Sequence, residues 1–284
     1  MFEVVRGSCL DLSAEQLRGF HAMITDPPYS QYVHDHAMTI GSGRGPRKRD
    51  FGFARASRAL RRGIASFAPR MSGWSLIFSD LESAHLWRYA VQAQFVRTVV
   101  LDDAGRADYE GAIPWVRWSQ PQLSGDRPPS GSEVVSVFWG GQGRKMWWGP
   151  GGLTSFRRRC LRGANKHPTE KPLDLMLDIV SWFTNFGQCV FDPCAGLGTT
   201  GLACRLLGRE FFGCEIDAEW QMRAAERLTV GLSDRDRARA EEWCLASLAE
   251  ENRVAVLPNR QNAGAIARAV HRREDIERVA ACLR

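Results

Sequence analysis

The chain has 284 residues, a formal net charge of +6, 44% hydrophobic residues and 25% charged residues. This is the composition of an ordinary globular protein, with enough length for one large α/β domain or two modest ones. No run approaches the ~20 apolar residues that cross a bilayer, and no signal-peptide pattern begins the chain, so we expect a cytoplasmic protein with no membrane partner.

The first 94 residues alternate short apolar runs with longer amphipathic ones, which favours an α/β arrangement. The expected strands are 2–7, 21–26 and 74–79, and the expected helices are 13–20, 54–67 and 81–94. Residues 41–49 are glycine-rich and basic, which predicts a mobile basic loop. The segment contains GxGxG letters, but it follows no expected strand, so no dinucleotide-binding turn is predicted there.

From about residue 95 to residue 165 the alternation fails. Two strand-like runs, 95–101 and 134–139, flank loops that are dense in Gly, Pro, Trp and Arg. Five tryptophans fall here: Trp115, Trp118, Trp139, Trp147 and Trp148. They suit either an aromatic mini-core or a recognition surface, on which rings stack on bases and arginines contact phosphates.

Regular alternation returns after residue 166. The expected order is helix 173–186, strand 189–191, helix 199–207, strand 210–214 and helix 218–229, which is the order of a parallel βαβα unit. Residues 231–284 are charged and largely helical, and we expect them to form an extension outside the sheet.

The motif Asp26-Pro27-Pro28-Tyr29 follows an apolar run that predicts a buried strand. The prolines end the sheet ladder and fix the backbone just beyond the strand. A carboxylate, a fixed carbonyl and an aromatic face are thereby placed at the carboxyl edge of the sheet, where open α/β folds bind ligands. Such a set can hold a planar amino group while its ring stacks on Tyr29. Taken alone, the motif also fits a simple proline turn.

A second motif runs from Asp192 to Thr200 and consists of a strand end, a small-residue turn and a helix start. Its glycines let backbone amides approach a ligand closely. The next expected strand ends near Glu215, where a carboxylate in a doubly wound sheet can bind a ribose diol. No Walker A lysine follows the glycines, so ATP hydrolysis is not expected. A nucleoside without a pyrophosphate fits this turn better than a nicotinamide cofactor.

Together with the segment 167–172 (His-Pro-Thr-Glu-Lys-Pro), these motifs resemble those of the S-adenosylmethionine-dependent DNA amino-methyltransferases. The catalytic motif precedes the cofactor motif, as in the beta class of that family. The resemblance implies a Rossmann-like α/β fold with a mostly parallel sheet flanked by helices and a circularly permuted motif order. It implies four parts: a catalytic half (1–94), an irregular target-recognition region (95–165), a cofactor half (166–230) and a helical C-terminal extension (231–284).

The resemblance also implies a role for each matched position. Asp26 and the Pro27 carbonyl would accept hydrogen bonds from the target amine, beside Pro28, while Tyr29 would stack on the flipped base. Thr169 and Lys171 would bind the methionine carboxylate of S-adenosylmethionine. The full set of implied cofactor-binding residues is Ser8, Cys9, Asp26, His167, Thr169, Lys171, Asp192, Ala195, Gly196, Gly198, Thr199, Thr200, Glu215 and Ile216.

Two positions depart from the family pattern. The family commonly has Gly-Asp after the first strand, where this chain has Gly7-Ser8, with Asp11 as a weak substitute. Cys194 stands where the family usually has phenylalanine, and its place in the cofactor loop predicts packing rather than the nucleophile of a cytosine-C5 enzyme. The eight cysteines contain no CxxC pair, so neither a zinc site nor any other metal is expected.

The family resemblance predicts methylation of adenine N6, because Asp-Pro-Pro-Tyr goes mostly with adenine in that family. Cytosine N4 is the alternative, since the amine chemistry is the same. A DNA-binding regulator with the same fold is a rival from another class, and an RNA or protein amine is a third possibility.

Basic clusters favour duplex DNA as the partner, although such clusters also occur on simple solvated faces. The implied DNA-binding residues are Arg44, Arg47, Lys48, Arg49, Arg157, Arg158 and Arg159. We further expect association with the nucleoid. The family resemblance adds a homodimer and, as a possible partner, a cognate restriction endonuclease.

Overall fold

The structure, a computed structural model, describes residues 1–29, 38–41, 44–48, 55–80, 83–94, 109–117, 132–141, 145–149, 156–158, 169–255 and 263–284. Its strands are β1 (Phe2–Arg6), β2 (Ala22–Thr25), β3 (Met38–Gly41), β4 (Arg44–Lys48), β5 (Trp74–Ser79), β6 (Tyr109–Arg117), β7 (Ser132–Trp139), β8 (Phe156–Arg158), β9 (Cys189–Asp192) and β10 (Glu210–Glu215). Its α-helices are α2 (Arg58–Phe67), α3 (Ala84–Gln94), α4 (Leu173–Phe183), α5 (Thr199–Leu207), α6 (Ala218–Thr229), α7 (Asp234–Ala255) and α8 (Ala263–Leu283).

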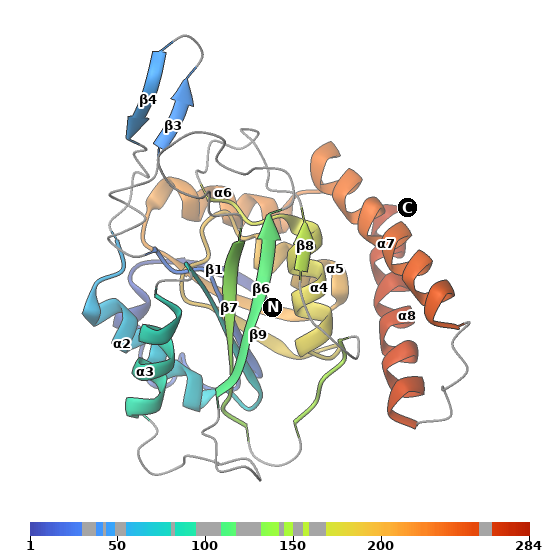
Figure 1. The fold of residues 1–284 in the computed structure, drawn as a ribbon, viewed down its shortest axis with the longest axis horizontal. Coiled ribbons are helices and arrows are strands. Elements are labelled where there is room, and N and C mark those ends of the chain that lie inside the picture. Colours follow the sequence, from blue (N-terminus) through green and yellow to red (C-terminus); the bar gives the residue numbers. More distant parts are fainter. Residues whose placement is uncertain are drawn as a thin grey trace.

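Eight of the described strands form one sheet in the order β1-β10-β9-β2-β5-β7-β6-β8 (Figure 1). The five strands from β1 to β5 in this order are parallel, β7 runs antiparallel to β5 and β6, and β8 is parallel to β6. The sheet is therefore mostly parallel and flanked by helices, as expected for a Rossmann-like fold. Strands β9 and β2 are neighbours although the first lies far downstream of the second, which is the permuted order that the motifs predict.

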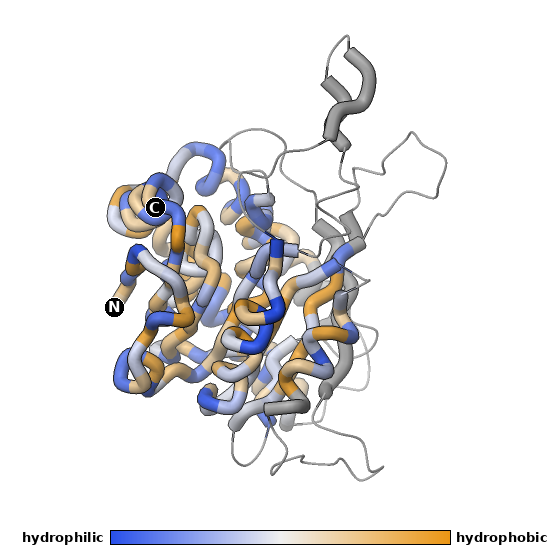
Figure 2. The backbone as a smooth tube through the Cα atoms, turned by 90° about the vertical axis from the view of Figure 1, so that its left-hand side faces the viewer, coloured by the Kyte–Doolittle hydropathy of each residue, from blue (hydrophilic) through white to orange (hydrophobic). Residues whose placement is uncertain are grey.

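Each face of the sheet has its own apolar core, because successive side chains of a strand point to opposite faces. Ile24 packs in the cluster that contains the residues of α4 and α5. Met23, one residue earlier, packs in the cluster that contains the residues of α2 and α3. The two helix groups lie on opposite sides of the sheet in Figure 1. Figure 2 shows hydrophobic segments in the body of the molecule and hydrophilic ones over much of its surface.

Helices α5 and α6 have the bounds expected from the sequence because their ends are locally encoded. Helix α5 lies between Gly198 and Gly208, which adopt left-handed φ angles of 70° and 71°. Helix α6 begins after Asp217, whose carboxylate accepts hydrogen bonds from the Glu219 and Trp220 amides. Helix α2 begins four residues later than expected, because Ser57 caps it by accepting from the Leu60 amide.

The expected helix over residues 13–20 is wrong, since the segment forms turns. Ser13 and Gln16 exchange backbone-to-side-chain hydrogen bonds like those of a helix start. The chain leaves helical geometry at Gly19, where φ is 83°. The expected strand 95–101 lies outside the described residues, and helix α4 ends at Phe183 rather than at residue 186.

The basic segment 41–49 is not simply a loop, because it contains β4, which pairs antiparallel with the preceding strand β3. The hairpin projects from the body of the molecule (Figure 1). Strand β7 confirms the expected strand 134–139. Strands β6, β7 and β8 all come from the region 95–165, and they continue the main sheet rather than form a separate sheet.

The C-terminal residues form the two helices α7 and α8 outside the sheet, as expected. They are anchored to the core by a buried ion pair in which Arg209 donates to both carboxylate oxygens of Asp275 on α8. Trp243 on α7 also donates its indole N–H to Asp178 on α4 at 2.8 Å. Within the described part of the chain, no helix combines the length and apolarity needed to cross a membrane.

Candidate active site

The sequence motifs converge because they follow strands that are neighbours in the sheet. Asp26 follows β2, and Asp192 ends β9, which is hydrogen-bonded to β2. Glu215 ends β10, which pairs with β9 on its other side. The carboxyl ends of these three parallel strands therefore meet at one edge, where open α/β sheets form ligand crevices.

The turn after β9 is held open by hydrogen bonds to its backbone. The Gly196 amide donates to Glu215 Oε2 at 2.8 Å, and the Ala195 amide donates to the Cys214 carbonyl at 2.8 Å. Asp192 accepts from the Cys194 amide at 3.0 Å and from the Thr200 hydroxyl at 2.8 Å. The turn is thus fixed between β10 and the first turn of α5.

A cleft of about 180 Å³ lies over this turn. Most of the residues that the sequence predicts for cofactor binding line it, namely Ser8, Cys9, Asp26, Thr169, Lys171, Asp192, Ala195, Gly196, Thr199, Thr200, Glu215 and Ile216. Pro28 of the catalytic motif also lines it. Gly198 lies in the same turn without lining the cleft, and His167 is outside the described residues.

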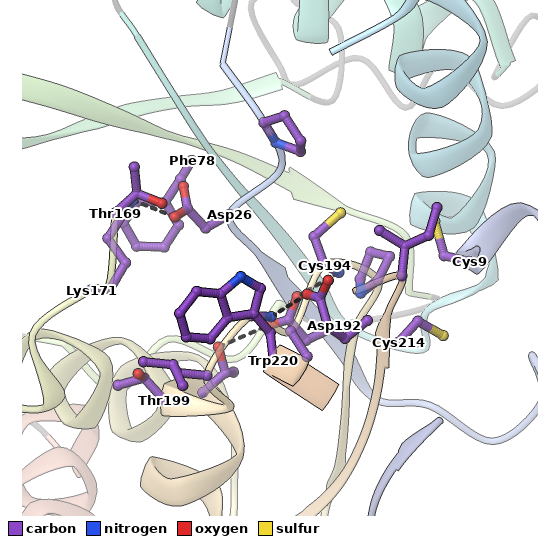
Figure 3. A pocket seen from close by; sticks show the side chains of 18 of the residues that line it. Cys9, Asp26, Phe78, Thr169, Lys171, Asp192, Cys194, Thr199, Cys214 and Trp220 are labelled. Atoms are coloured by element: carbon purple, nitrogen blue, oxygen red, sulfur yellow. Dashed lines mark hydrogen bonds and ion pairs between the residues drawn. The ribbon is translucent and has the colours of Figure 1, made fainter. Parts of the chain in front are cut away.

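Sequence reasoning missed several lining residues: Gly7, Leu60, Phe78, Glu170, Met176, Pro193, Cys194, Leu197, Cys214 and Trp220. Trp220 could have been inferred, since it is an aromatic residue in the first turn of the helix after Glu215. Figure 3 shows Asp26, Phe78, Thr169 and Lys171 together on one side and Cys9, Cys194 and Cys214 together on the other. Cys194 packs against the apolar cluster of β9 and β10, in agreement with its predicted packing role.

At the Asp26 end of the cleft, four polar side chains form one largely buried network. Lys171 forms an ion pair with Asp26 Oδ2 and lies 3.5 Å from Glu133 Oε2. The Tyr29 hydroxyl donates to the same oxygen of Glu133. Asp26 Oδ1 is buried and has no hydrogen-bond partner among the described residues. Glu133, which comes from β7, was not predicted.

Burial dominates the electrostatics of the carboxylates in the cleft. It raises the pKa of Asp26, an effect that Lys171 opposes and Glu133 reinforces. It raises the pKa of Asp192 to about 7, against hydrogen bonds from Cys194 and Thr200. Burial also raises the pKa of Glu215. Lys171 differs, because the two carboxylates beside it outweigh its burial and raise its pKa.

The expected DNA-binding residues lie on two strands, β4 and β8, or outside the described residues. Arg44, Arg47 and Lys48 lie on β4, and Arg157 and Arg158 lie on β8, the edge strand of the sheet. Arg49 and Arg159 fall outside the described residues.

Three of the five tryptophans are packed into the fold, which favours the aromatic-core interpretation for them. Trp139 meets Trp74 edge to face at 4.8 Å between ring centroids, and Trp147 meets Phe183 at 4.9 Å. Trp148 stacks on His271 of α8 at 4.4 Å. Trp115 lies on β6, and Trp118 is outside the described residues.

The permuted, mostly parallel sheet and the cleft at its carboxyl edge define a Rossmann-like α/β fold, which this chain shares with solved DNA methyltransferases. The M1.HpyAVI–SAM complex matches 81% of this chain and 100% of that chain, with a TM-score of 0.59 and 23% identity. The cytosine-N4-specific PvuII DNA methyltransferase matches 84% of this chain and 90% of its own, with a TM-score of 0.55 and 13% identity. At these identities the likeness concerns the fold alone.

Sequence comparisons find similarity over part of the chain. Residues 118–226 match the family model described as DNA methylase. The Type II methyltransferase M2.LlaDCHI of Lactococcus lactis is 31% identical over 116 residues, which cover 41% of this chain and 42% of that protein. The DNA adenine methyltransferase YhdJ of Escherichia coli is 40% identical over 83 residues, or 28% of each chain. The chain thus spans less than half the length of these relatives, and the matched segment is similar in sequence to these DNA methyltransferases.

Proposed function

We propose that the protein is a DNA adenine-N6 methyltransferase that uses S-adenosylmethionine. The observation that carries this proposal is the single cleft that joins Asp26 and Pro28 of the target-amine motif to the glycine turn and Glu215. A methyl donor in the turn and an amine at Asp26 would then share one cavity. The partial match to relatives with methyltransferase names supports the same reaction.

The residues of the cleft fit the proposed cofactor. Glu215 accepts backbone hydrogen bonds on both carboxylate oxygens, from Gly196 and from Asp217, which orients it for a ribose diol. Trp220 offers an aromatic face, and Ala195 and Gly196 leave room for close approach. When bound, S-adenosylmethionine supplies an electrophilic methyl group on a sulfonium.

The proposed chemistry at the other end of the cleft is a direct displacement. Asp26 and the Pro27 carbonyl accept the two hydrogens of the exocyclic amine, which directs the nitrogen lone pair at the methyl group. Asp26 Oδ1 is suited to this role because it is buried and has no hydrogen-bond partner in the described structure. The nitrogen–carbon bond would form as the sulfur–carbon bond breaks, S-adenosylhomocysteine would be the leaving group, and the methylated amine would release one proton to water. Tyr29 stacks on the base, which has to leave the duplex to reach the cleft.

Duplex DNA is the proposed substrate, with the region 95–165 as the target-recognition part. The basic residues of β4 and β8 support this assignment, since phosphate contacts supply most of the affinity for DNA. A homodimer is a further proposal, supported by exposed apolar side chains on the C-terminal helices: Leu245, Leu248, Ile266 and Val270. A cognate restriction endonuclease and association with the nucleoid are proposals that follow from the reaction.

The test is methyl transfer from tritiated S-adenosylmethionine to amplified, unmodified bacterial DNA, followed by mass spectrometry of the nucleosides. We expect N6-methyladenine with the wild type and none with Asp26→Ala, which should still bind the cofactor in calorimetry. N4-methylcytosine would instead establish the cytosine alternative. Cofactor binding without labelled DNA would favour the regulator, and preferential labelling of RNA would overturn duplex DNA as the substrate.

A further inference from the structure

Glu133 lies outside all the sequence motifs, yet the fold brings it into the target-amine end of the cleft. It is the second residue of β7, and the next residue, Val134, pairs with Ser79 at the carboxyl end of β5. This register places Glu133 beside the edge where β2 and β5 end. Its side chain is only 12% exposed. A buried glutamate needs partners, because an unpaired buried charge is costly.

Those partners are Tyr29, which is proposed to stack on the base, and Lys171, which forms an ion pair with Asp26. The Tyr29 hydroxyl donates to Glu133 Oε2, and the Lys171 ammonium lies 3.5 Å from the same oxygen. Lys171 also lies 5.2 Å from the centroids of the Tyr29 and Phe78 rings. The ammonium is therefore held between two carboxylates and two aromatic faces.

Two consequences follow from the shared oxygen. The Tyr29 ring is anchored at its hydroxyl end as well as at its backbone, which limits its rotation before a base stacks on it. The Lys171 ammonium interacts with both Glu133 and Asp26 Oδ2. Asp26 Oδ1 remains buried without a hydrogen-bond partner among the described residues. Glu133 thus acts on both the stacking face and the amine acceptor without reaching the reacting atoms itself.

We propose that Glu133 is a positioning residue for methyl transfer: it fixes the Tyr29 ring and shares Lys171 so that Asp26 can accept the target amine. This inference rests on the proposed function, since it assigns a role within that same site. The alternative is a purely structural ion pair, which would affect stability and leave the catalytic parameters of the folded enzyme unchanged.

Charge provides a readout that separates these two roles. The groups facing Asp26 are Lys171 from the segment before α4, Glu133 from β7, Tyr29 from its own segment and Asp192 from β9. The negative charge of Glu133 raises the pKa of Asp26. Glu133→Gln removes that charge and keeps the shape of the side chain. The pKa of Asp26 should therefore fall, and the acidic limb of the pH profile of kcat should move to lower pH.

The experiment compares wild type, Glu133→Gln, Tyr29→Phe and the double variant, with Glu241→Gln on the exposed face of α7 as the matched control. We expect kcat to fall at least about tenfold in both single variants through lost orientation, while the dissociation constant for S-adenosylmethionine changes by less than about threefold. The control should match the wild type. The double variant should be little worse than the poorer single variant, because Glu133→Gln weakens and Tyr29→Phe removes the same charge-assisted hydrogen bond.

The inference would be overturned if folded Glu133→Gln had the kcat of the wild type and an unshifted acidic limb in its pH profile. Fully additive losses of kcat in the double variant would overturn it as well. If Glu133→Gln does not fold, Tyr29→Phe decides, because it removes the other half of the bond and keeps the ring: a normal kcat then rejects the inference. An inactive wild type that binds no cofactor would instead reject the proposed function, which keeps the two failures apart.

Discussion

The Lys171 ammonium and the Asp26 carboxylate form a direct ion pair although 145 residues separate them in the chain. Their side chains are 7% and 21% exposed. Removing one partner of a buried pair leaves an uncompensated charge. We therefore expect Lys171→Met to lower the free energy of unfolding by about 3 to 5 kcal/mol, as measured by urea denaturation.

The double variant Lys171→Met with Asp26→Asn is the control for that prediction. It removes both charges, so part of the lost stability should return even though Glu133 remains. If the double variant is as unstable as Lys171→Met alone, the loss comes from packing of the lysine stem and not from the ion pair.

Asp192 makes the ligand-free protein less stable as the pH rises. Its pKa in the folded chain is about 7 against 3.8 for an ordinary aspartate, because it is buried. Between these values the folded state holds a proton that the unfolded state has released. The free energy of unfolding should therefore fall across this window, by up to about 4 kcal/mol from this group.

Asp192→Asn should flatten that dependence, since asparagine does not titrate. Urea denaturation at several pH values from 5 to 8, without ligand, compares the two proteins. His271 contributes in the opposite direction, because burial lowers its pKa, but this contribution is common to both. Equal slopes for wild type and variant would contradict the elevated pKa of Asp192.

The sequence predicted those parts of the fold whose signals are local. Helix α6 begins at a capping aspartate and helix α5 lies between two glycines, so both bounds were correct. Residues 13–20 carry a local helix-start signal as well, but Gly19 ends the turn before a helix forms. Strands β6 and β8 could not be inferred, because their pairing depends on partners distant in the chain.

The candidate site also combines residues that local motifs predicted with one residue that they did not. Asp26, Asp192 and Glu215 were predicted because each follows or ends a strand within a contiguous motif. Glu133 is a single acid at the start of an ordinary apolar strand, and its relation to Tyr29 spans 104 residues. Its contact with the motifs arises only from the register of β7 on β5, which no local pattern encodes.

The ion pair between Arg209 and Asp275 ties α8 to the core, and both side chains are fully buried. Arg209 also donates to the Thr184 carbonyl at 2.8 Å. We expect Asp275→Ala to cost about 3 to 5 kcal/mol of unfolding free energy, measured by thermal or urea denaturation of the whole chain.

Glu274→Ala is the matched control, because this neighbouring acid pairs with Arg278 on the surface and is 54% exposed. Its loss should cost less than about 1 kcal/mol. Similar effects of the two substitutions would show that the C-terminal helices are only loosely attached and that the buried pair adds little.

Gly198 is constrained both by its backbone and by its neighbour. Its φ angle is 70°, and a Cβ added there would lie 3.2 Å from the Ala224 Cβ on α6. Gly187 has a similar φ of 75° and nothing within 4 Å of an added Cβ, so Gly187→Ala measures the backbone strain alone. That strain is about 1 to 2 kcal/mol.

Gly198→Ala should lower the free energy of unfolding more than Gly187→Ala does in urea denaturation, because α6 has to move as well. It should also weaken binding of S-adenosylmethionine in calorimetry, since other residues of the turn that it distorts line the cleft, whereas Gly187→Ala should leave binding unchanged. Equal losses of stability and unchanged binding in both variants would mean that the turn tolerates a side chain and that its glycine serves the backbone angle alone.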